Sequence, residues 1–573
     1  MTNHEIARIL LHIADILDIQ GENPFKVRAY VRAAQTLQGL TQEVSTLADP
    51  AQLRELPGIG EAIAKKIQEL LTTGSLRYYE ELKQSPYARL TELLRIPGMG
   101  PKHVRLVYEQ LGVSSVEQLQ QAAEQGKLRT LPGLGEKSEQ KILEGIQQAL
   151  RFRERMPLGY VLPQATAMVE RLRQVREVQQ AALAGSLRRM RETVADADIL
   201  VASSQPEPVM EAFVRLPHVE RVLSKGSTKS SVVTTDGFQV DLRVVSPTSF
   251  GAAQHYFTGS KPHNIHIRSL GVDKGLKINE YGVFKGEELV AGATEEEVFA
   301  AVGLPWIPPE LREDQGEIEA ATQGRLPRLV TREDLRGDLH VHTNWTDGAD
   351  SIPDMASAAQ AKGYAYVAIC DHSPTVGITN GLTPERLLAQ MADVDALNQR
   401  LAAAGNPFRV LKGIEVDIRP DGTLDLPEDL LSRLDVVVAA VHTRFSLSME
   451  EMTRRLVRAI ENPAVDIIAH PTGRLIGRRD PYQVDIDMLI DACRACNKAL
   501  ELNAYPERLD LSDLHCRKAK EKGVKVAIST DAHRHGNLEW MAYGLATARR
   551  GWLEPADVLN CLALDQLLAW LRR

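Results

Sequence analysis

The sequence predicts a multidomain protein of the α+β and α/β classes: helical domains at the amino terminus, a mixed central part and a carboxyl-terminal barrel. Three observations support this prediction. A chain of 573 residues is too long for one hydrophobic core. The pattern Pro-Gly-x-Gly recurs three times before residue 140, each time ahead of a helical stretch. After residue 335, seven apolar strand-like runs alternate with helical stretches, as in a barrel of parallel strands.

The composition is that of a globular protein, with 43% hydrophobic and 25% charged residues. The apolar run VVVAAV at 436–441 is far shorter than a membrane span. The first residues, MTNHEIARIL, do not show the basic and long apolar regions of a signal peptide. Five cysteines, an odd number in a large chain, fit a reducing compartment. We therefore expect a cytoplasmic protein.

Charge is unevenly distributed along the chain. Residues 1–290 hold 36 lysines and arginines against 33 acidic residues, whereas residues 291–573 hold 32 against 43. The net charge of −8 therefore does not exclude a nucleic-acid partner, because a local basic face matters more than the total.

The three Pro-Gly-x-Gly segments are LPGIG at 56–60, IPGMG at 96–100 and LPGLG at 131–135. In each, the second glycine opens the next helix with free backbone N–H groups that suit a phosphate. The pattern resembles the helix-hairpin-helix motif, which holds the nucleic-acid backbone without reading its sequence. One copy could simply join two helices, but three copies favour DNA binding. The glycines expected to contact DNA are Gly58, Gly60, Gly98, Gly100, Gly133 and Gly135.

The stretch TVADADILVAS, residues 193–203, places two carboxylates at the start of an apolar strand. Asp196 and Asp198 are two residues apart, so they share one face of the strand. A turn that leads into a strand is the alternative, since aspartate favours turns. Asp241, in the alternating pattern QVDLRVV, can complete a set of three carboxylates on adjacent strands. Such a set can hold two Mg²⁺ ions about 3.5–4 Å apart, as in two-metal nucleotidyl transfer.

The segment GSLRR, residues 185–189, precedes these aspartates, and a Gly-Ser turn followed by arginines suits a triphosphate. With DADILV, VDLRVV and the block at 256–284, it resembles the family X DNA polymerases, such as polymerase beta, over residues 1–310. The resemblance implies a polymerase palm and thumb, where a primer 3′ hydroxyl attacks the α-phosphate of a dNTP. It implies triphosphate contacts from Gly185, Ser186 and Arg189, sugar contacts from Tyr256, Phe257 and Gly259, a base contact from Asn264 and a template contact from Arg268.

The match departs from the family pattern at two places. Gln239 stands beside the third aspartate where the vertebrate relative has an arginine, which puts the efficiency of the reaction in doubt. KPHN, residues 261–264, replaces the vertebrate residues, so Lys261 and His263 could add phosphate contacts or lie in a solvated loop.

The amino-terminal helical region resembles the family's small domain, which binds a 5′ phosphate in a gap. Counting from LPGIG, Lys66 falls on the lysine that forms a Schiff base in the relative, whereas Ala62 falls where a second basic residue is expected. Lys26, in NPFKVRAYVRAA, is expected to contact the 5′ phosphate. A lysine on an exposed helix is more often a solvated residue, so lyase chemistry at Lys66 is a hypothesis only.

Histidines and carboxylates gather just after the apolar runs of the carboxyl-terminal part. The carboxyl ends of parallel barrel strands meet at one rim, so we expect these side chains to converge. A single histidine would more often be structural, but nine donors at strand ends suit two or three divalent ions, Zn²⁺ or Mn²⁺. The expected ligands are His340, His342, Asp347, His372, Glu415, His442, His470, Asp531 and His533.

These motifs, from DLHVHTNWTDG to ISTDAH, resemble the PHP (polymerase and histidinol phosphatase) domain over residues 336–573. The resemblance implies a distorted (β/α)7 barrel and metal-dependent phosphoester hydrolysis. A 3′–5′ exonuclease is the natural activity on bound DNA, with 3′-end cleaning or abasic-site cleavage as variants. Arg444, Arg474 and Arg478 follow ligand-bearing segments and could steer the DNA backbone.

These patterns divide the chain into six segments. We expect a helical DNA-binding domain at 1–90, fingers at 91–153, a palm at 154–255, a thumb at 256–315, a linker at 316–335 and the PHP domain at 336–573. The leading hypothesis is a monomeric repair polymerase that fills gaps in primed DNA with dNTPs, as in base excision repair, and carries a 3′ nuclease. The alternatives are a nucleotidyltransferase for RNA or a small molecule, and a DNA-end-binding scaffold with a structural barrel.

Overall fold

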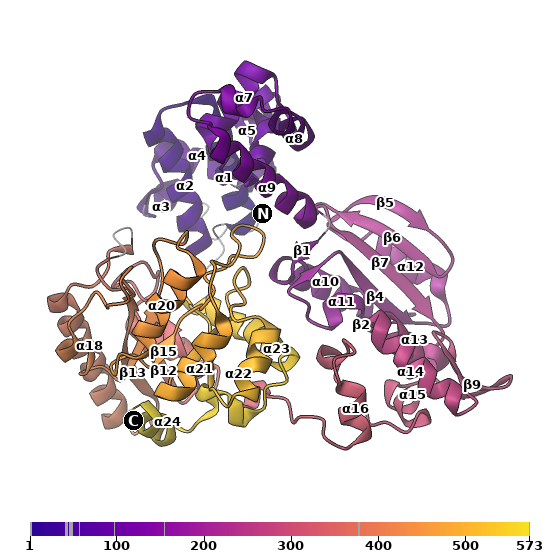
Figure 1. Ribbon diagram of the computed structural model, residues 1–573. Helices are drawn as coiled ribbons and strands as arrows, with labels where there is room; N and C mark the ends of the chain where they lie inside the picture. The colour runs from indigo at the N-terminus through magenta and orange to yellow at the C-terminus, as the bar shows by residue number, and fades with distance from the viewer. Residues whose placement is uncertain are drawn as a thin grey trace. The chain divides into compact units, whose positions relative to one another are not determined.

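The computed structural model describes residues 3–39, 44, 50–56, 58–96, 98–153, 155–375 and 379–571. The chain divides into two compact units, Met1–Glu154 with Gly477–Arg479, and Arg155–Ile476 with Asp480–Arg573. Figure 1 labels the helices and strands of both units. Among the described residues, no helix combines the length and the apolar character that crossing a membrane requires.

The described residues of the first unit form helices and turns. The helices are α1 (Asn3–Gln20), α2 (Pro24–Gly39), α3 (Pro50–Glu55), α4 (Glu61–Thr73), α5 (Arg77–Lys83), α6 (Pro86–Leu90), α7 (Pro101–Leu111), α8 (Val116–Glu124) and α9 (Glu136–Arg153). Leu10, Leu37 and Ile67 contribute to one hydrophobic core, built from α1, α2 and α4. Val107 and Ile142 contribute to a second core, built from α7 to α9.

The second unit begins with a five-stranded sheet in the order β2-β4-β7-β6-β5. The strands are β2 (Gln180–Leu183), β4 (Asp196–Ala202), β5 (Val219–Lys225), β6 (Lys229–Thr234) and β7 (Gln239–Val245). Strands β4 and β7 are parallel, whereas the other neighbours are antiparallel. Helices α10 (Leu158–Arg173) and α12 (Pro206–Val214) cover one face, where Ile199, Phe213 and Val240 are buried together (Figure 1).

A smaller subdomain follows this sheet. Its elements are α13 (Phe250–Thr258), α14 (Lys261–Asp273), β8 (Lys277–Asn279), β9 (Gly282–Lys285), β10 (Glu288–Ala291) and α15 (Glu295–Ala301). The segment 316–335, expected to be a linker, differs from that expectation because it contains α16 (Glu317–Thr322). Ile318 and Ala321 of α16 are buried in the same core as Phe299. Only these two apolar side chains of α16 are buried within a charged stretch, so the composition of the segment gave no sign of a packed helix.

A barrel of seven parallel strands forms the rest of the second unit. The strands are β11 (Gly337–Val341), β12 (Tyr366–Ile369), β13 (Arg409–Asp417), β14 (Val436–Ala440), β15 (Ile467–Ile468), β16 (Ala499–Asn503) and β17 (Val526–Ser529). They pair in chain order, and the parallel bridge between Val341 and Ala532 joins the last strand region to the first. Seven strands were predicted for this part of the chain, so the predicted barrel class is confirmed.

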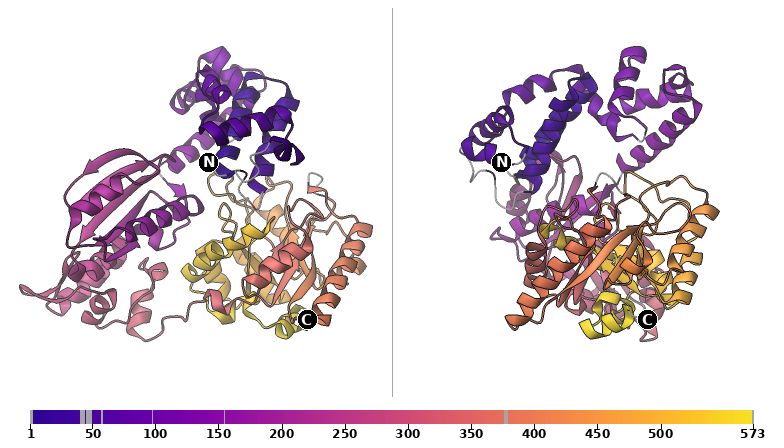
Figure 2. Two further views of the ribbon diagram at one scale, coloured as in Figure 1. Left: turned by 180° about the vertical axis from the view of Figure 1, so that it is seen from behind. Right: turned by 90° about the vertical axis from the view of Figure 1, so that its left-hand side faces the viewer.

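Helices surround the barrel strands, as the two further views of the ribbon show (Figure 2). They include α17 (Ile352–Ala361), α18 (Pro384–Ala403), α20 (Met449–Ile460), α21 (Ile486–Cys496), α22 (Asp513–Glu521) and α23 (Met541–Arg550). Side chains of these helices and of the strands, among them Met452, Ile490 and Ile528, share one core. Both faces of each strand are thus buried, which explains why the strands are continuous apolar runs in the sequence.

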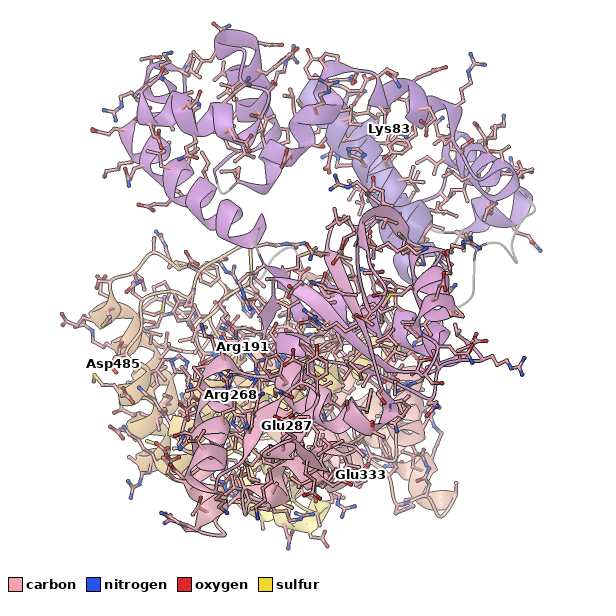
Figure 3. The ribbon with its side chains drawn as sticks, turned by 90° about the vertical axis from the view of Figure 1, so that its right-hand side faces the viewer. Lys83, Arg191, Arg268, Glu287, Glu333 and Asp485 are labelled. Atoms are coloured by element: carbon pink, nitrogen blue, oxygen red, sulfur yellow. The ribbon has the colours of Figure 1, made fainter. Side chains whose placement is uncertain are left out.

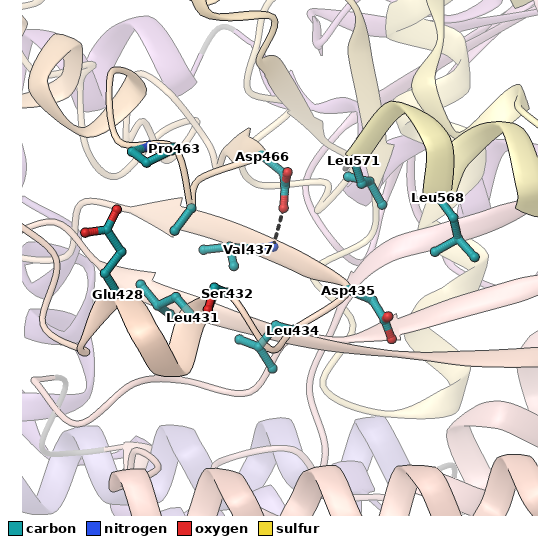
Figure 4. A pocket seen from close by; sticks show the side chains of 11 residues that line it. Glu428, Leu431, Ser432, Leu434, Asp435, Val437, Pro463, Asp466, Leu568 and Leu571 are labelled. Carbon is teal, nitrogen blue, oxygen red and sulfur yellow. Dashed lines mark hydrogen bonds between the residues drawn. The ribbon is translucent and has the colours of Figure 1, made fainter. Parts of the chain in front are cut away.

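A cavity of about 270 Å³ lies at the amino-terminal end of the barrel strands (Figure 4). Its lining includes Asp435 and Asp466, which directly precede β14 and β15, and Leu571 of α24 (Leu564–Leu571). Burial raises the pKa of Asp466 to about 7, and its carboxylate accepts a hydrogen bond from the Val437 N–H at 2.8 Å. The predicted metal ligands follow the strands at the other end, so this cavity is not the metal site.

Candidate active sites

The register of β4 and β7 brings the three predicted palm carboxylates together. Asp198 pairs with Asp241 across the two parallel strands, and Asp196 pairs with Gln239. Because Asp196 and Asp198 alternate with the buried Ala197, both face away from α10 and α12. Three carboxylates on one face of a strand pair suit divalent cations, which prefer oxygen ligands.

The electrostatics of the palm carboxylates fit a cation site. Burial, together with Asp196 and Asp241, raises the pKa of Asp198 to about 6. Burial and the charge of Asp241 also raise the pKa of Asp196 above its ordinary value. A divalent cation relieves exactly this kind of repulsion between neighbouring carboxylates, so the donor set and its charges suit the predicted Mg²⁺.

Asp241 differs because two neighbours stabilise its charge. Lys229 Nζ lies 2.8 Å from one carboxylate oxygen, and Gln239 Nε2 donates to the other at 2.7 Å. Burial opposes ionisation, but the hydrogen bonds from Lys229, Gln239 and Ser231 bring the pKa of Asp241 below its ordinary value. Sequence reasoning missed Lys229, because only the pairing of β6 with β7 brings its positive charge next to Asp241.

The Gly-Ser turn approaches the carboxylates closely. Gly185 has a φ of +63°, and a Cβ at this position would lie 2.3 Å from Asp198 Oδ2, so glycine is required here. Ser186 lies in the same turn, within the short helix α11 (Gly185–Arg188). Arg189 follows it and donates through Nη1 to the Thr258 carbonyl, next to Gly259.

The remaining predicted nucleotide contacts lie on α13 and α14. Asn264 Nδ2 donates to the Tyr256 carbonyl at 2.7 Å, and Arg268 Nε donates to the Asn264 carbonyl at 3.3 Å (Figure 3 labels Arg268). The guanidinium of Arg243 lies 4.3 Å from the centre of the Phe257 ring. The hydrogen bond from Arg189 to Thr258 connects the end of α13 to the Gly-Ser turn. Contacts of these residues with a nucleotide stay predictions.

Buried ion pairs that the sequence did not indicate connect the palm and thumb. Arg188 donates through both Nη atoms to Glu295, at 2.8 and 2.7 Å, and the buried Arg312 binds the same carboxylate at 2.6 Å. Arg189 Nε donates to Glu313 at 3.0 Å. The side chain of Arg189 is therefore held in place by a carboxylate before any nucleotide binds.

Position 263 requires a correction. His263, for which a phosphate contact was one possibility, is fully buried, and its Nδ1 lies 2.7 Å from Glu317 of α16. This ring is a structural link to α16 rather than an exposed phosphate contact. Lys261 is exposed at the start of α14, so the structure leaves it available to a ligand.

The helix-hairpin-helix turns have the geometry that phosphate contacts require. The first glycine of each motif has a φ between +78° and +91°, which favours glycine. The glycine before each following helix borders open space, since a Cβ there would meet no heavy atom within 4 Å. The N–H groups in the first turns of α4, α7 and α9 can thus be approached by a phosphate, and in α7 they begin at Lys102 because Pro101 has none.

The two predicted DNA-contacting lysines converge on one tyrosine. Lys66 Nζ lies 4.8 Å from the centre of the Tyr78 ring, and Tyr78 also influences Lys26. Lys26 pairs with Glu22 at 2.8 Å, and this hydrogen bond is the main reason that its pKa is raised. Both lysines therefore lie near Tyr78, while their contacts with DNA stay predictions.

The barrel rim gathers eight of the nine predicted ligands into three groups. Within each group the ligand atoms lie within 4.8 Å of one another. The groups are His342, Asp347, His372 and His533; His340, His342 and Asp531; and His372, Glu415 and His442. The ninth residue, His470, places Nε2 3.1 Å from Glu415. Two histidines are shared between groups, as expected when neighbouring ions have common ligands.

Several possible metal-ligand atoms at this rim lie close together without forming hydrogen bonds. His372 Nδ1 and Glu415 Oε2 are 2.8 Å apart, yet both are buried without a hydrogen-bond partner in the described part of the chain. The buried Nδ1 of His342 likewise has none there. Outer carboxylates complete the arrangement: Glu501 lies 2.7 Å from His340 Nδ1, and Asp417 lies 3.2 Å from His442 Nδ1. Such outer partners orient metal-binding imidazoles, so the residues fit divalent ions.

Carboxylates and neighbouring histidines set the charge state of the rim. Burial opposes the charging of His372, but Glu415 and Asp347 outweigh it and raise its pKa to about 10. Glu415 and Asp417 similarly raise the pKa of His442 to about 9 against the effect of burial. In contrast, burial and the adjacent His533 and His372 lower the pKa of His342 to about 3. Protons therefore occupy positions that a cation can take over.

The three arginines near the rim differ in their surroundings. Arg474 is engaged with the protein: Nε donates to the Arg508 carbonyl at 2.9 Å, and Nη2 donates to Leu509 and Glu192. This corrects the expectation that Arg474 steers DNA. Arg444 is exposed, and its role and that of Arg478 stay predictions.

Comparisons with known proteins match several parts of the chain. Family models match for a helix-hairpin-helix domain at 1–76, a SAM-like helix-hairpin-helix tandem at 90–148, the DNA polymerase beta thumb at 253–313 and the PHP domain at 338–504. The chain is 43% identical to the DNA polymerase/3′-5′ exonuclease PolX of Bacillus subtilis, over 100% of both chains. It is 33% identical to a protein named "Probable phosphatase" of Thermoanaerobacter sp. (strain X514), over 39% of this chain and 89% of that protein.

The fold and the two sites define a family X DNA polymerase core joined to a PHP domain. Within that class, the chain belongs to the PolX family, of which the Bacillus subtilis protein is a member.

Proposed function

We propose that this chain is a DNA-directed DNA polymerase that fills short gaps during repair and carries a metal-dependent 3′–5′ exonuclease. The observation that carries the proposal is the presence of two separate sets of candidate cation ligands: carboxylates on neighbouring palm strands, and imidazoles with carboxylates at the barrel rim. Membership of a family with a member named DNA polymerase/3′-5′ exonuclease supports it.

In the palm, Asp196, Asp198 and Asp241 would hold Mg²⁺, which supplies charge neutralisation and Lewis acidity to the transferring phosphate. Backbone N–H groups of the Gly-Ser turn and the guanidinium of Arg189 would bind the triphosphate. Arg189 exchanges Glu313 for the triphosphate in this proposal, since both are anions within reach of the same side chain.

At the rim, the nine ligands would hold two or three Zn²⁺ or Mn²⁺ ions, which supply Lewis acidity to the phosphodiester. The chain's own residues fix the geometry: Glu501 and Asp417 hold the rings of His340 and His442 through Nδ1. Cleaning of damaged 3′ ends and cleavage at abasic sites are further reactions of the same bond type.

DNA would bind through the three helix-hairpin-helix turns, with Lys26 and Lys66 at the 5′ phosphate of a gap. The domain bounds proposed are 1–90, 91–153, 154–255, 256–315 and 336–573, with 316–335 as the connecting segment. We further propose a monomer in the cytoplasm, where its five free cysteines stay reduced. In the alternative, a DNA-end-binding scaffold, the PHP domain would need no complete ligand set.

A labelled primer in gapped DNA tests both reactions. With dNTPs and Mg²⁺ the primer should lengthen, and without dNTPs and with Mn²⁺ it should shorten. Asp196→Asn should stop only lengthening, and His340→Ala should stop only shortening. Glu220→Gln, an exposed palm change, and His515→Gln, a barrel histidine outside the rim groups, serve as matched controls and should leave both reactions unchanged.

The bound metal content of each variant separates lost chemistry from lost folding. If a folded Asp196→Asn or His340→Ala variant loses both reactions, the two sites do not act independently and the proposal is wrong. If the wild type lengthens primers but never shortens them, the scaffold reading of the barrel is correct.

A further inference from the structure

The loop that follows β16 brings an arginine to the barrel rim that sequence reasoning did not identify. Arg508 Nε lies 3.7 Å from Oδ2 of the predicted ligand Asp531. This distance is too long for a hydrogen bond, and the same Oδ2 already accepts one from Asn503 at 3.1 Å. Arg508 Nε is buried and has no hydrogen-bond partner among the residues that the structure describes.

The Nε–H of Arg508 is therefore free to bind an acceptor from outside the protein. The side chain of Arg508 is 16% exposed, so water can reach little of it. A guanidinium stays charged, and burying its N–H groups without acceptors is costly. A phosphodiester held at the adjacent rim has the oxygens that a guanidinium binds best, in the forked geometry that lysine cannot reproduce.

The loop that carries Arg508 contacts the palm. Arg474 donates to the carbonyls of Arg508 and Leu509, and its Nη2 donates to Glu192 at 2.7 Å. Pro506, in the same loop, packs against Gly159 of α10, where a Cβ would lie 2.2 Å from Pro506 Cβ. The loop that carries Arg508 is therefore braced from the palm side.

We propose that Glu192 of the palm is a positioning residue for the PHP site: through Arg474 it holds the loop 504–510 so that Arg508 binds the phosphate of the scissile phosphodiester. The proposal rests on the proposed phosphodiester hydrolysis at the rim. In this proposal, a residue of the palm holds part of the nuclease site in place.

A small chromogenic diester tests this in the whole protein, because its hydrolysis does not depend on DNA binding by the helix-hairpin-helix turns. Thymidine 5′-(p-nitrophenyl phosphate) with Mn²⁺ gains water across the P–O bond and releases thymidine 5′-phosphate and p-nitrophenolate. Arg508→Ala should lower kcat/KM roughly 10- to 100-fold, the value of a charge-assisted hydrogen bond to phosphate. Glu192→Gln should lower it about 3- to 10-fold, mainly through KM, with bound metal and primer extension unchanged.

The control is Glu310→Gln, which breaks a similar ion pair, to Arg549 at 2.7 Å, but does not touch the loop 504–510. It should leave diester hydrolysis at the wild-type level. In the double variant Glu192→Gln with Arg508→Ala, hydrolysis should equal that of Arg508→Ala alone, because Glu192 acts only through Arg508.

Three outcomes overturn the inference while the proposed hydrolysis stands: wild-type activity with an unchanged Glu192→Gln variant, an unchanged Arg508→Ala variant, or additive losses in the double variant. If the wild-type protein leaves the diester intact at every Mn²⁺ concentration, the proposed hydrolysis itself fails, and this inference fails with it.

Discussion

Replacing Asp198 by asparagine should stabilise the metal-free protein while it abolishes primer extension. The carboxylate of Asp198 is destabilised by burial and by Asp196 and Asp241, which raise its pKa to about 6. Since this pKa lies above the ordinary value of 3.8, the folded state holds the proton more tightly than the unfolded state does. Ionisation of Asp198 therefore costs stability as the pH rises through this interval.

The size of the effect follows from the shift. A rise from 3.8 to about 6 corresponds to a cost of about 3 kcal/mol at pH 8, where Asp198 is ionised in both states. At pH 5 the cost is about half as large, and below pH 4 it largely disappears. Asparagine has a similar shape and no charge, so Asp198→Asn should recover this energy and raise the unfolding temperature of the second unit by about 3 °C at pH 8.

Differential scanning calorimetry in EDTA, at pH 5 and at pH 8, measures the difference. Asp241→Asn is the matched control, because Lys229 and Gln239 stabilise the Asp241 carboxylate and its loss should destabilise the metal-free protein. Both variants should fail to extend a primer. Equal or lower stability of Asp198→Asn at pH 8, or the same gain at both pH values, would refute the reasoning.

Three further predictions concern the metals and the 5′ phosphate. The pKa values of His372 and His442 are about 10 and 9, so Mn²⁺ binding to the metal-free rim at pH 7.5 should release protons from both. The affinity of the rim for Mn²⁺ should therefore rise with pH. Calorimetry in buffers of different ionisation enthalpy counts the released protons. Mg²⁺ alone should support primer extension, whereas shortening should require Mn²⁺ or Zn²⁺, because imidazoles disfavour Mg²⁺. Lys66→Ala should weaken binding to a gap with a 5′ phosphate but not to a gap with a 5′ hydroxyl. Lys65 pairs with Glu61, so Lys65→Ala should leave both affinities unchanged. If borohydride traps no adduct at Lys66 on an abasic substrate, the lyase hypothesis is excluded.

The sequence predicted those parts of the sites that strand periodicity fixes. Asp196 and Asp198 share a face because a strand repeats every two residues, and the parallel pairing of β4 with β7 adds Asp241. The rim ligands could be predicted because the carboxyl ends of parallel barrel strands meet: His340 is the next-to-last residue of β11, and His442 lies two residues after the end of β14.

The sequence could not predict contacts that depend on how distant elements pack. Lys229 is an ordinary strand residue until the order of β6 and β7 places it beside Asp241. Glu313 lies 124 positions from Arg189, and Arg474 lies 282 positions from Glu192, so no local pattern links either pair. The helix α16 was missed because charged residues dominate the segment around its few apolar contacts.

The residues that the sequence predicted and those that it did not differ in the role of their charges. Ligands such as Asp198 and Glu415 concentrate charge at strand ends where burial opposes it, and such costly patterns are visible in a sequence because apolar runs surround them. Lys229 instead neutralises the ligand Asp241 from a neighbouring strand, and Arg474 holds a loop next to the rim, so their roles depend on packing and not on local sequence. A change at a ligand should therefore remove one reaction outright, whereas a change at Lys229 or Arg474 should alter how well that reaction is tuned.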